Sequence, residues 1–160
     1  MKVLRSIRYV LPAALLAGAF ACSKSSDVTG AVNALGRISV SAPDNATSGS
    51  QFDVDVNALN VGVQGIHNSM VQVTLPGPLT VNSVTASPGT TATFTAGPGA
   101  TVTWTTGTID ANTQSTLHIA TIGTLPAGSA AVTVRIQASM TADGINPGDA
   151  VATKDVQINP

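Results

Sequence analysis

The segment QFDVDVNAL, residues 51–59, alternates apolar and polar side chains along almost its whole length. Its even-numbered residues, from Phe52 to Ala58, are apolar, and the odd-numbered ones up to Asn57 are polar. Successive side chains of a β-strand point to opposite faces, so this period of two places all the apolar residues on one side. A helix, with about 3.6 residues per turn, would scatter them around its surface. The segment therefore predicts a strand with one face in a core and the other in water.

The same pattern recurs after Leu35, in short runs separated by turns that contain Gly and Pro. We expect about nine strands, at residues 37–42, 51–59, 69–75, 79–86, 90–96, 100–106, 114–122, 130–138 and 150–158. No segment of this region keeps a helical apolar period, and its frequent Val and Thr are β-branched residues that favour sheets. Evenly spaced short strands predict an all-β domain over residues 36–160, folded as an antiparallel two-sheet sandwich of about eight or nine strands.

Residues 1–21 have the three parts of a secretory signal peptide. A basic start precedes a mostly apolar, uncharged run, residues 9–21, that ends in the small-x-small sequence Ala19-Phe20-Ala21. The run is too short to span a bilayer as a helix, which needs about 20 residues. We therefore expect export, with cleavage directly before Cys22.

Cys22 is the only cysteine of the chain, and residues 23–35 after it are small and polar, as in a flexible tether. The bond between Ala21 and Cys22 fits the general signal peptidase, which would leave a secreted or periplasmic soluble protein with an exposed thiol. It also resembles a bacterial lipoprotein lipobox. That resemblance implies that Cys22 becomes the new N-terminus, is acylated on its sulfur and anchors the protein to a membrane. The outer membrane or cell surface is favoured, because Ser23 is not the Asp that is typical of inner-membrane retention.

Composition excludes several classes of function. Residues 22–160 contain four basic residues, eight Asp and no Glu, for a net charge of −4, so we expect no binding to nucleic acid. The two histidines, His67 and His118, are far apart in the sequence, and the chain has no Gly-x-Ser-x-Gly motif. We therefore expect neither a catalytic site nor a metal or other cofactor.

The loop DGINPGD, residues 143–149, is the one stretch that invites a metal hypothesis. Asp143, Asn146 and Asp149 offer oxygen ligands of the kind that Ca²⁺ prefers, although their spacing is not that of an EF-hand. Asp, Asn and Gly are also the residues that turns require. Both interpretations stay open, and a calcium-assisted carbohydrate-binding accessory domain is the less favoured function.

Trp104 shares a strand face with Val102, so we expect it to fill the sandwich core. The alternative is an exposed platform for stacking sugars. Residues 22–160 contain few aromatic side chains, which counts against a sugar-binding face.

Three stretches occur in a familiar order: SGSQFDVDVNALNVG (48–62), VQVTLPGPLTVNSVTASPGT (71–90) and TVTWTTGTIDANTQSTLHI (101–119). Together they resemble the Ig-like conserved repeat domain of bacterial surface proteins, with Leu75-Pro76, Val81, Val84, Trp104 and Gly107-Thr108-Ile109 in the family's places. The region around residues 48–89 also looks like a cohesin-type sandwich, a domain that docks partner modules on the cell surface. Both resemblances imply an Ig-like sandwich that binds or spaces, with no catalysis.

The function expected from these features is that of a non-catalytic, membrane-tethered extracytoplasmic lipoprotein. Its single Ig-like module would serve adhesion, envelope organisation or protein–protein interaction. The expected partners are a membrane, through the lipid on Cys22, and a protein or an envelope polymer. The alternatives are a cohesin-like docking module and a self-assembling surface or filament subunit.

Overall fold

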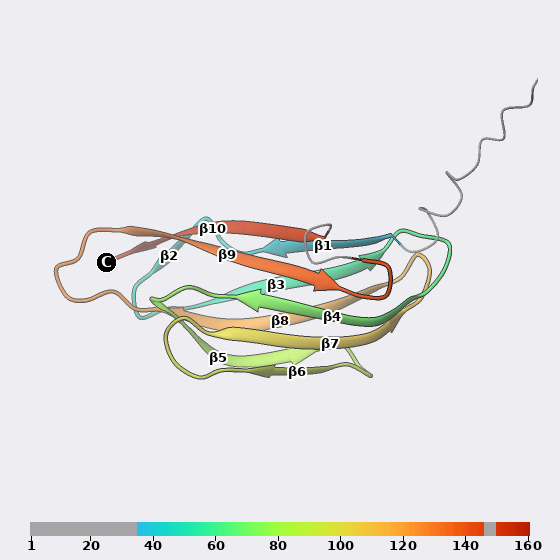
Figure 1. Cartoon of the computed structure of the whole chain (residues 1–160). Coiled ribbons are helices and arrows are strands. Elements are labelled where there is room, and N and C mark those ends of the chain that lie inside the picture. The colour runs from blue at the N-terminus through green and yellow to red at the C-terminus, as the bar shows by residue number, and fades with distance from the viewer. Residues whose placement is uncertain (1–34, 146–149) are drawn as a thin grey trace, which may run out of the picture.

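Two β-sheets stacked face to face make up the part of the chain that the computed structural model describes, residues 35–145 and 150–160 (Figure 1). Ten strands occur in this part: β1 (Gly36–Ser41), β2 (Asn45–Thr47), β3 (Gln51–Asn60), β4 (Ile66–Thr74), β5 (Leu79–Ala86), β6 (Thr91–Phe94), β7 (Thr101–Ile109), β8 (Gln114–Gly123), β9 (Val132–Thr141) and β10 (Val151–Asn159). The described residues contain no helix long and apolar enough to cross a bilayer. The predicted all-β sandwich is confirmed.

The strands form a four-stranded sheet, in the order β1-β3-β8-β5, and a six-stranded sheet, in the order β2-β10-β9-β4-β7-β6. Strand β1 starts at one end of the elongated sandwich, and the C-terminus lies at the opposite end (Figure 1). Strands β1 and β3 pair over six residues, from Gly36 opposite Asn60 to Ser41 opposite Asp55.

Nine of the ten strands coincide with predicted segments, and β2 is the strand that the sequence did not predict. With three residues, β2 is too short to show an alternation. It pairs in parallel with the end of β10, from Asn45 opposite Gln157 to Thr47 opposite Asn159. This parallel pair is the one departure, among the described strands, from the antiparallel pairing that the sequence predicted.

Strand β4 starts at Ile66, three residues before the predicted position, because a β-bulge interrupts its alternation. Ile66 lies opposite Ile109 and Ser69 opposite Gly107, so β4 has one extra residue in this stretch. Asn68 takes up the irregularity with a φ of 53°, a left-handed conformation that Asn tolerates better than most residues. At the bulge, His67 and Asn68 are both exposed, so the alternation of buried and exposed side chains is interrupted.

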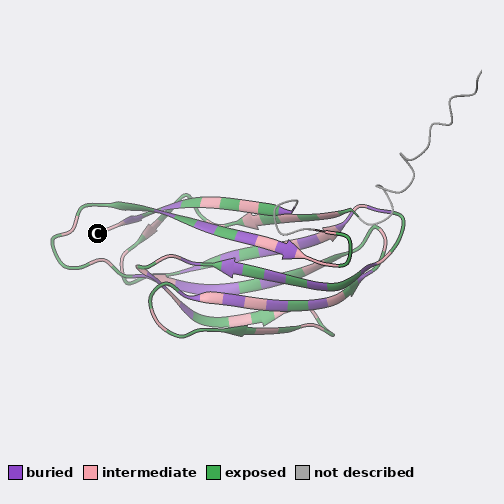
Figure 2. Ribbon diagram, in the orientation of Figure 1, coloured by how far each residue is buried: buried purple, intermediate pink, exposed green. Residues whose placement is uncertain are grey.

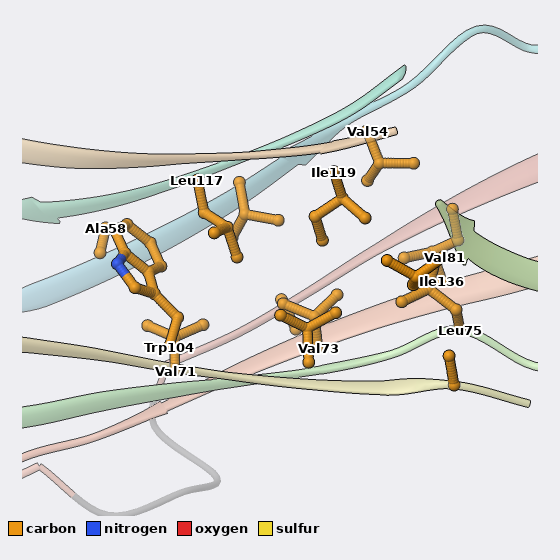
Figure 3. Close-up of a cluster of buried hydrophobic side chains, with 14 of the residues drawn as sticks. Val54, Ala58, Val71, Val73, Leu75, Val81, Trp104, Leu117, Ile119 and Ile136 are labelled. Atoms are coloured by element: carbon orange, nitrogen blue, oxygen red, sulfur yellow. The ribbon is translucent and has the colours of Figure 1, made fainter. Parts of the chain in front are cut away.

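Most of the other strands alternate between more buried and more exposed residues, as the bands of colour in Figure 2 show, although Ile119, Ala120 and Thr121 of β8 are buried in succession. In β3, Phe52, Val54, Val56 and Ala58 are all buried, as their period of two predicted. Figure 3 shows side chains of both sheets meeting in the space between them, with Leu117 and Ile119 from one sheet and Val73 and Ile136 from the other. Because these four side chains are completely buried, the core extends along the length of the sandwich.

Trp104 on β7 belongs to this core, as predicted, with no exposed surface. Its indole N–H donates to the hydroxyl of Thr90 at 3.0 Å, and the Thr90 hydroxyl donates to the carbonyl of Ser87 at 2.7 Å. The only polar atom of the indole is thus satisfied in the interior, as a buried tryptophan requires. The alternative of an exposed sugar platform at Trp104 is excluded.

We expect Trp104→Ala to lower the free energy of unfolding by about 3–5 kcal/mol, because it leaves a cavity between the sheets. Denaturation with urea measures the change. Phe94→Ala is the matched control, because Phe94 lies on the edge strand β6 and keeps 39% of its surface exposed, so its loss should cost much less. A loss of less than about 1 kcal/mol for Trp104→Ala would contradict a core role.

Candidate functional site

Asp53, Asp55 and His118 form a cluster on the outer face of the four-stranded sheet. Asp53 and Asp55 come from β3, and His118 comes from the neighbouring strand β8, directly opposite Asp55. The buried residues on either side of each of them along its strand fix this outward placement, because successive side chains of a strand point to opposite faces. The side chains of Asp53, Asp55 and His118 are 54%, 57% and 46% exposed. We call this surface the charged face.

Both ring nitrogens of His118 are directed at carboxylates. Nδ1 lies 2.8 Å from Oδ1 of Asp55, and Nε2 lies 3.4 Å from Oδ1 of Asp53. Only the doubly protonated ring can donate a proton toward both carboxylates. The hydrogen bond with Asp55 raises the pKa of His118 above its ordinary value, against a partial opposing effect of burial, and the negative charges of Asp53 and Asp55 add to the rise. The geometry therefore favours a positively charged His118 between two negative charges.

This arrangement is not that of a hydrolytic triad. A triad places a nucleophilic hydroxyl on one ring nitrogen of the histidine and an orienting acid on the other. In His118 a carboxylate faces each nitrogen, so neither nitrogen is directed at a hydroxyl. In residues 35–145 and 150–160, no group of three His, Cys, Asp or Glu side chains is arranged to hold a metal ion. The cluster is suited to presenting charge to a partner.

The second histidine is not brought near the first. His67 lies on β4 of the six-stranded sheet, with its Nδ1 at 3.2 Å from the hydroxyl of Thr108. Beside it, the side-chain amide of Asn68 donates to a carboxylate oxygen of Asp143 at 2.8 Å, and the backbone N–H of Asp143 donates to the carbonyl of His67. Asp143 thus helps to hold the bulge of β4.

Several residues singled out in the sequence lie outside the described residues. They are the predicted cleavage and lipidation residues Ala19, Ala21 and Cys22, and the calcium candidates Asn146 and Asp149. Asp143 is the only member of the calcium hypothesis whose contacts the structure gives.

Sequence reasoning did not identify the charged face, although the alternation of its strands predicts that the members point outward. The alternation of β3 places Asp53 and Asp55 on an outer face, and the pattern of residues 114–122 does the same for His118. Nothing in either pattern pairs β3 with β8, whose residues Asp55 and His118 are 63 positions apart. Two outward Asp on one strand and an outward His on the other were the one sequence signal that favoured these strands as neighbours.

Comparison with known proteins supports the fold. No protein-family model matches the sequence, and no curated protein matches it. The cohesin module of a family 33 glycoside hydrolase from Clostridium perfringens superposes with a TM-score of 0.57 at 15% identity, over 79% of this chain and 98% of the module. The CARDB domain of the PF1109 protein from Pyrococcus furiosus, solved in complex with di-metal ions, gives a TM-score of 0.55 at 18% identity, over 79% of this chain and 89% of that domain.

A third solved structure, of AvmM, which catalyses macrocyclization in alchivemycin A biosynthesis, gives a TM-score of 0.50 at 11% identity, over 81% of this chain and 90% of AvmM. At these identities the likeness shows the β-sandwich fold alone. The predicted resemblance to a cohesin-type sandwich is therefore confirmed for the fold. Since the same fold occurs in AvmM, function has to be argued from the residues of this chain.

The raised pKa of His118 gives a testable pH dependence. Because the folded state binds the proton more tightly than the unfolded chain, the ion pairs stabilise the fold fully below about pH 6.5 and lose their effect as the pH rises through the raised pKa. The loss should stay below about 1 kcal/mol, because the groups are exposed.

Titration of the His118 ring by NMR measures the pKa. Asp55→Asn should lower it, whereas Asp143→Asn should leave it unchanged; an equal response to both variants would contradict the cluster.

Proposed function

We propose that this protein is a non-catalytic, membrane-tethered extracytoplasmic lipoprotein whose single Ig-like sandwich domain binds a protein partner through the charged face. The observation that carries the binding proposal is the exposed cluster of Asp53, Asp55 and His118 on a rigid sheet. Binding surfaces gain affinity when their groups are held in place before the partner arrives, and strands β3 and β8 supply that rigidity. Adhesion and envelope organisation are roles that such a module would serve.

The anchor is proposed from the sequence. Cys22 is the only cysteine, and it stands at the one position where lipidation requires a thiol, after a signal-like segment and before a polar tether. Buried acyl chains contribute about 0.8 kcal/mol per methylene, so two or more chains would hold the domain stably at a membrane. The outer membrane or the cell surface is the proposed location.

The chemistry of the partner follows from the charges of the face. Both carboxylates are more than half exposed, and His118 shares its one positive charge between them, which leaves the cluster with net negative charge. A partner that presents Lys or Arg would complement it, and such complementarity increases the rate and the specificity of association. The exposed charge of the cluster favours docking of this kind over a purely spacing role.

Self-assembly into a surface filament is the second candidate function. Strands β5 and β6 are at the edges of their sheets, and edge strands can pair with a further strand. Phe94 on β6 exposes 39% of its surface at that edge. Size-exclusion chromatography at increasing concentration separates the two candidates, because a concentration-independent monomer would contradict self-assembly.

We expect Cys22→Ser to abolish incorporation of a fatty-acid probe and to release the protein from the membrane fraction. The measurement is metabolic labelling with a clickable fatty acid, followed by fractionation of the cells. Ser23→Ala, next to the anchor, is the matched control and should remain labelled. Membrane association that persists in Cys22→Ser would contradict lipid anchoring at this residue.

For the partner, we expect Asp55→Lys to abolish the retention of an envelope protein on the immobilised full-length chain. Asp110→Lys is the matched control, because Asp110 is also exposed and the substitution changes the net charge equally. The retained protein, identified by mass spectrometry and purified, is then titrated against both variants. Equal binding to both, or no retained protein with the unmodified chain, would contradict the proposed role of the charged face.

A further inference from the structure

The outer face of the six-stranded sheet differs in chemistry from the charged face. Alternate residues of β4, β6, β7, β9 and β10 point outward there and form three cross-strand rows. The rows are Thr141, Met70, Thr105 and Thr91; Val151, Ser139, Gln72, Thr103 and Thr93; and Thr153, Gln137, Thr74 and Thr101. We call this surface the hydroxyl face. Eight of its thirteen residues are Thr, and none is charged.

Backbone pairing makes the hydroxyl face a regular two-dimensional array. The register is continuous, since Thr93 lies opposite Thr103, Thr103 opposite Gln72, and Gln72 opposite Ser139. Neighbouring strands are about 4.8 Å apart, and outward residues of one strand repeat every 6.7 Å or so. Thr is stiff about its first side-chain torsion, so each hydroxyl and methyl group is held close to its lattice position.

The hydroxyl groups of this array are available to an external ligand. Among the hydrogen bonds of the described residues, the only one made by a side chain of the hydroxyl face is from Thr141 to the carbonyl of Met70, at 3.4 Å. The next outward pair along β9 and β10 is charged, but Arg135 and Asp155 neutralise each other in a bidentate pair with N–O distances of 2.8 and 2.9 Å. The charges of the other sheet, including Asp53 and Asp55, point away on the opposite side.

The composition of the face disfavours the usual kinds of partner. An ionic partner, including nucleic acid, needs uncompensated charge, which the array lacks. An apolar partner needs a contiguous apolar patch, and Met70 and Val151 are the only large exposed hydrophobic residues among the thirteen. The array contains no Trp, Tyr or Arg, the residues that dominate protein hot spots, and no aromatic ring for stacking on a sugar. The regular, uncharged array best matches a ligand that is itself uncharged, periodic and hydrogen-bonding.

We propose that the hydroxyl face binds the surface of ice crystals. Ice presents a periodic, uncharged array of hydrogen-bond donors and acceptors, and a threonine hydroxyl can both donate and accept, as a lattice water does. The neighbouring methyl group makes no hydrogen bonds to its hydration water, so that water can be displaced or join the lattice without the loss of a hydrogen bond to the protein. A charged side chain would instead keep its own oriented shell. This activity needs neither the lipid anchor nor the charged face.

The test is partition of the full-length chain carrying Cys22→Ser between slowly grown ice and the remaining liquid. We expect the protein to concentrate in the ice, whereas a non-binding protein is pushed into the liquid. Thr103→Lys, at the centre of the array, should abolish incorporation. Thr85→Lys is the matched control, since Thr85 is an exposed strand residue on the other sheet, and it should leave incorporation unchanged. Thermal unfolding of each variant verifies that it is folded.

Smaller changes at Thr103 separate the contribution of its hydroxyl group to ice binding from that of its methyl group. Thr103→Ser keeps the hydroxyl, Thr103→Val keeps the methyl, and each should weaken incorporation less than Thr103→Lys does. The proposal would be overturned if the protein with an unchanged hydroxyl face were excluded from ice. Equal incorporation of the Thr103→Lys and Thr85→Lys variants would overturn it as well. Retention on insoluble cellulose that Thr103→Lys abolishes, without incorporation into ice, would also overturn it in favour of a polysaccharide ligand.

Discussion

Burial of alternate side chains between the two sheets is the interaction on which the rest of this structure depends. The long strands contribute alternate residues to the shared core, and burying a side chain such as Val54 or Ile136 is worth about 1.5–3 kcal/mol. The bulky Trp104 is accommodated there because its single N–H is bonded to Thr90. The remaining residues of each strand have no part in this core, and they therefore form two independent outer surfaces.

Those two surfaces have diverged in chemistry. One has two carboxylates around a histidine, and the other has an uncharged array of mostly hydroxyl and amide groups beside the mutually neutralised pair of Arg135 and Asp155. The core constrains only the inward residues, so outward positions can be changed with little cost in stability. A sandwich of this kind can therefore carry two unrelated binding functions on opposite sides. This freedom also explains why the fold is shared by a cohesin module and by AvmM, whose own activity cannot be transferred to this chain.

The period of two was sufficient to predict the fold class, nine of the strands in the described region and the burial of residues such as Phe52 and Trp104. It failed where a structural feature has no period. The short strand β2 depends on contact with β10, and the bulge at Asn68 depends on pairing with β7. The contact of His118 with Asp55 likewise depends on which strands are neighbours, and this is set by packing over the whole domain. The hypotheses on Cys22 stay predictions, since that residue lies outside the described part.

Because β1 starts at one end of the sandwich and the chain ends at the other, tension between these two points runs along the strands. Strand β1 is joined to β3 by six consecutive antiparallel residue pairs that lie across this direction. Pulling lengthwise loads all of them in shear at the same time, whereas a pull at one corner would open them one after another. Under such a load the domain would yield only when several backbone hydrogen bonds between β1 and β3 break together, so its resistance to force would depend on the direction of pulling.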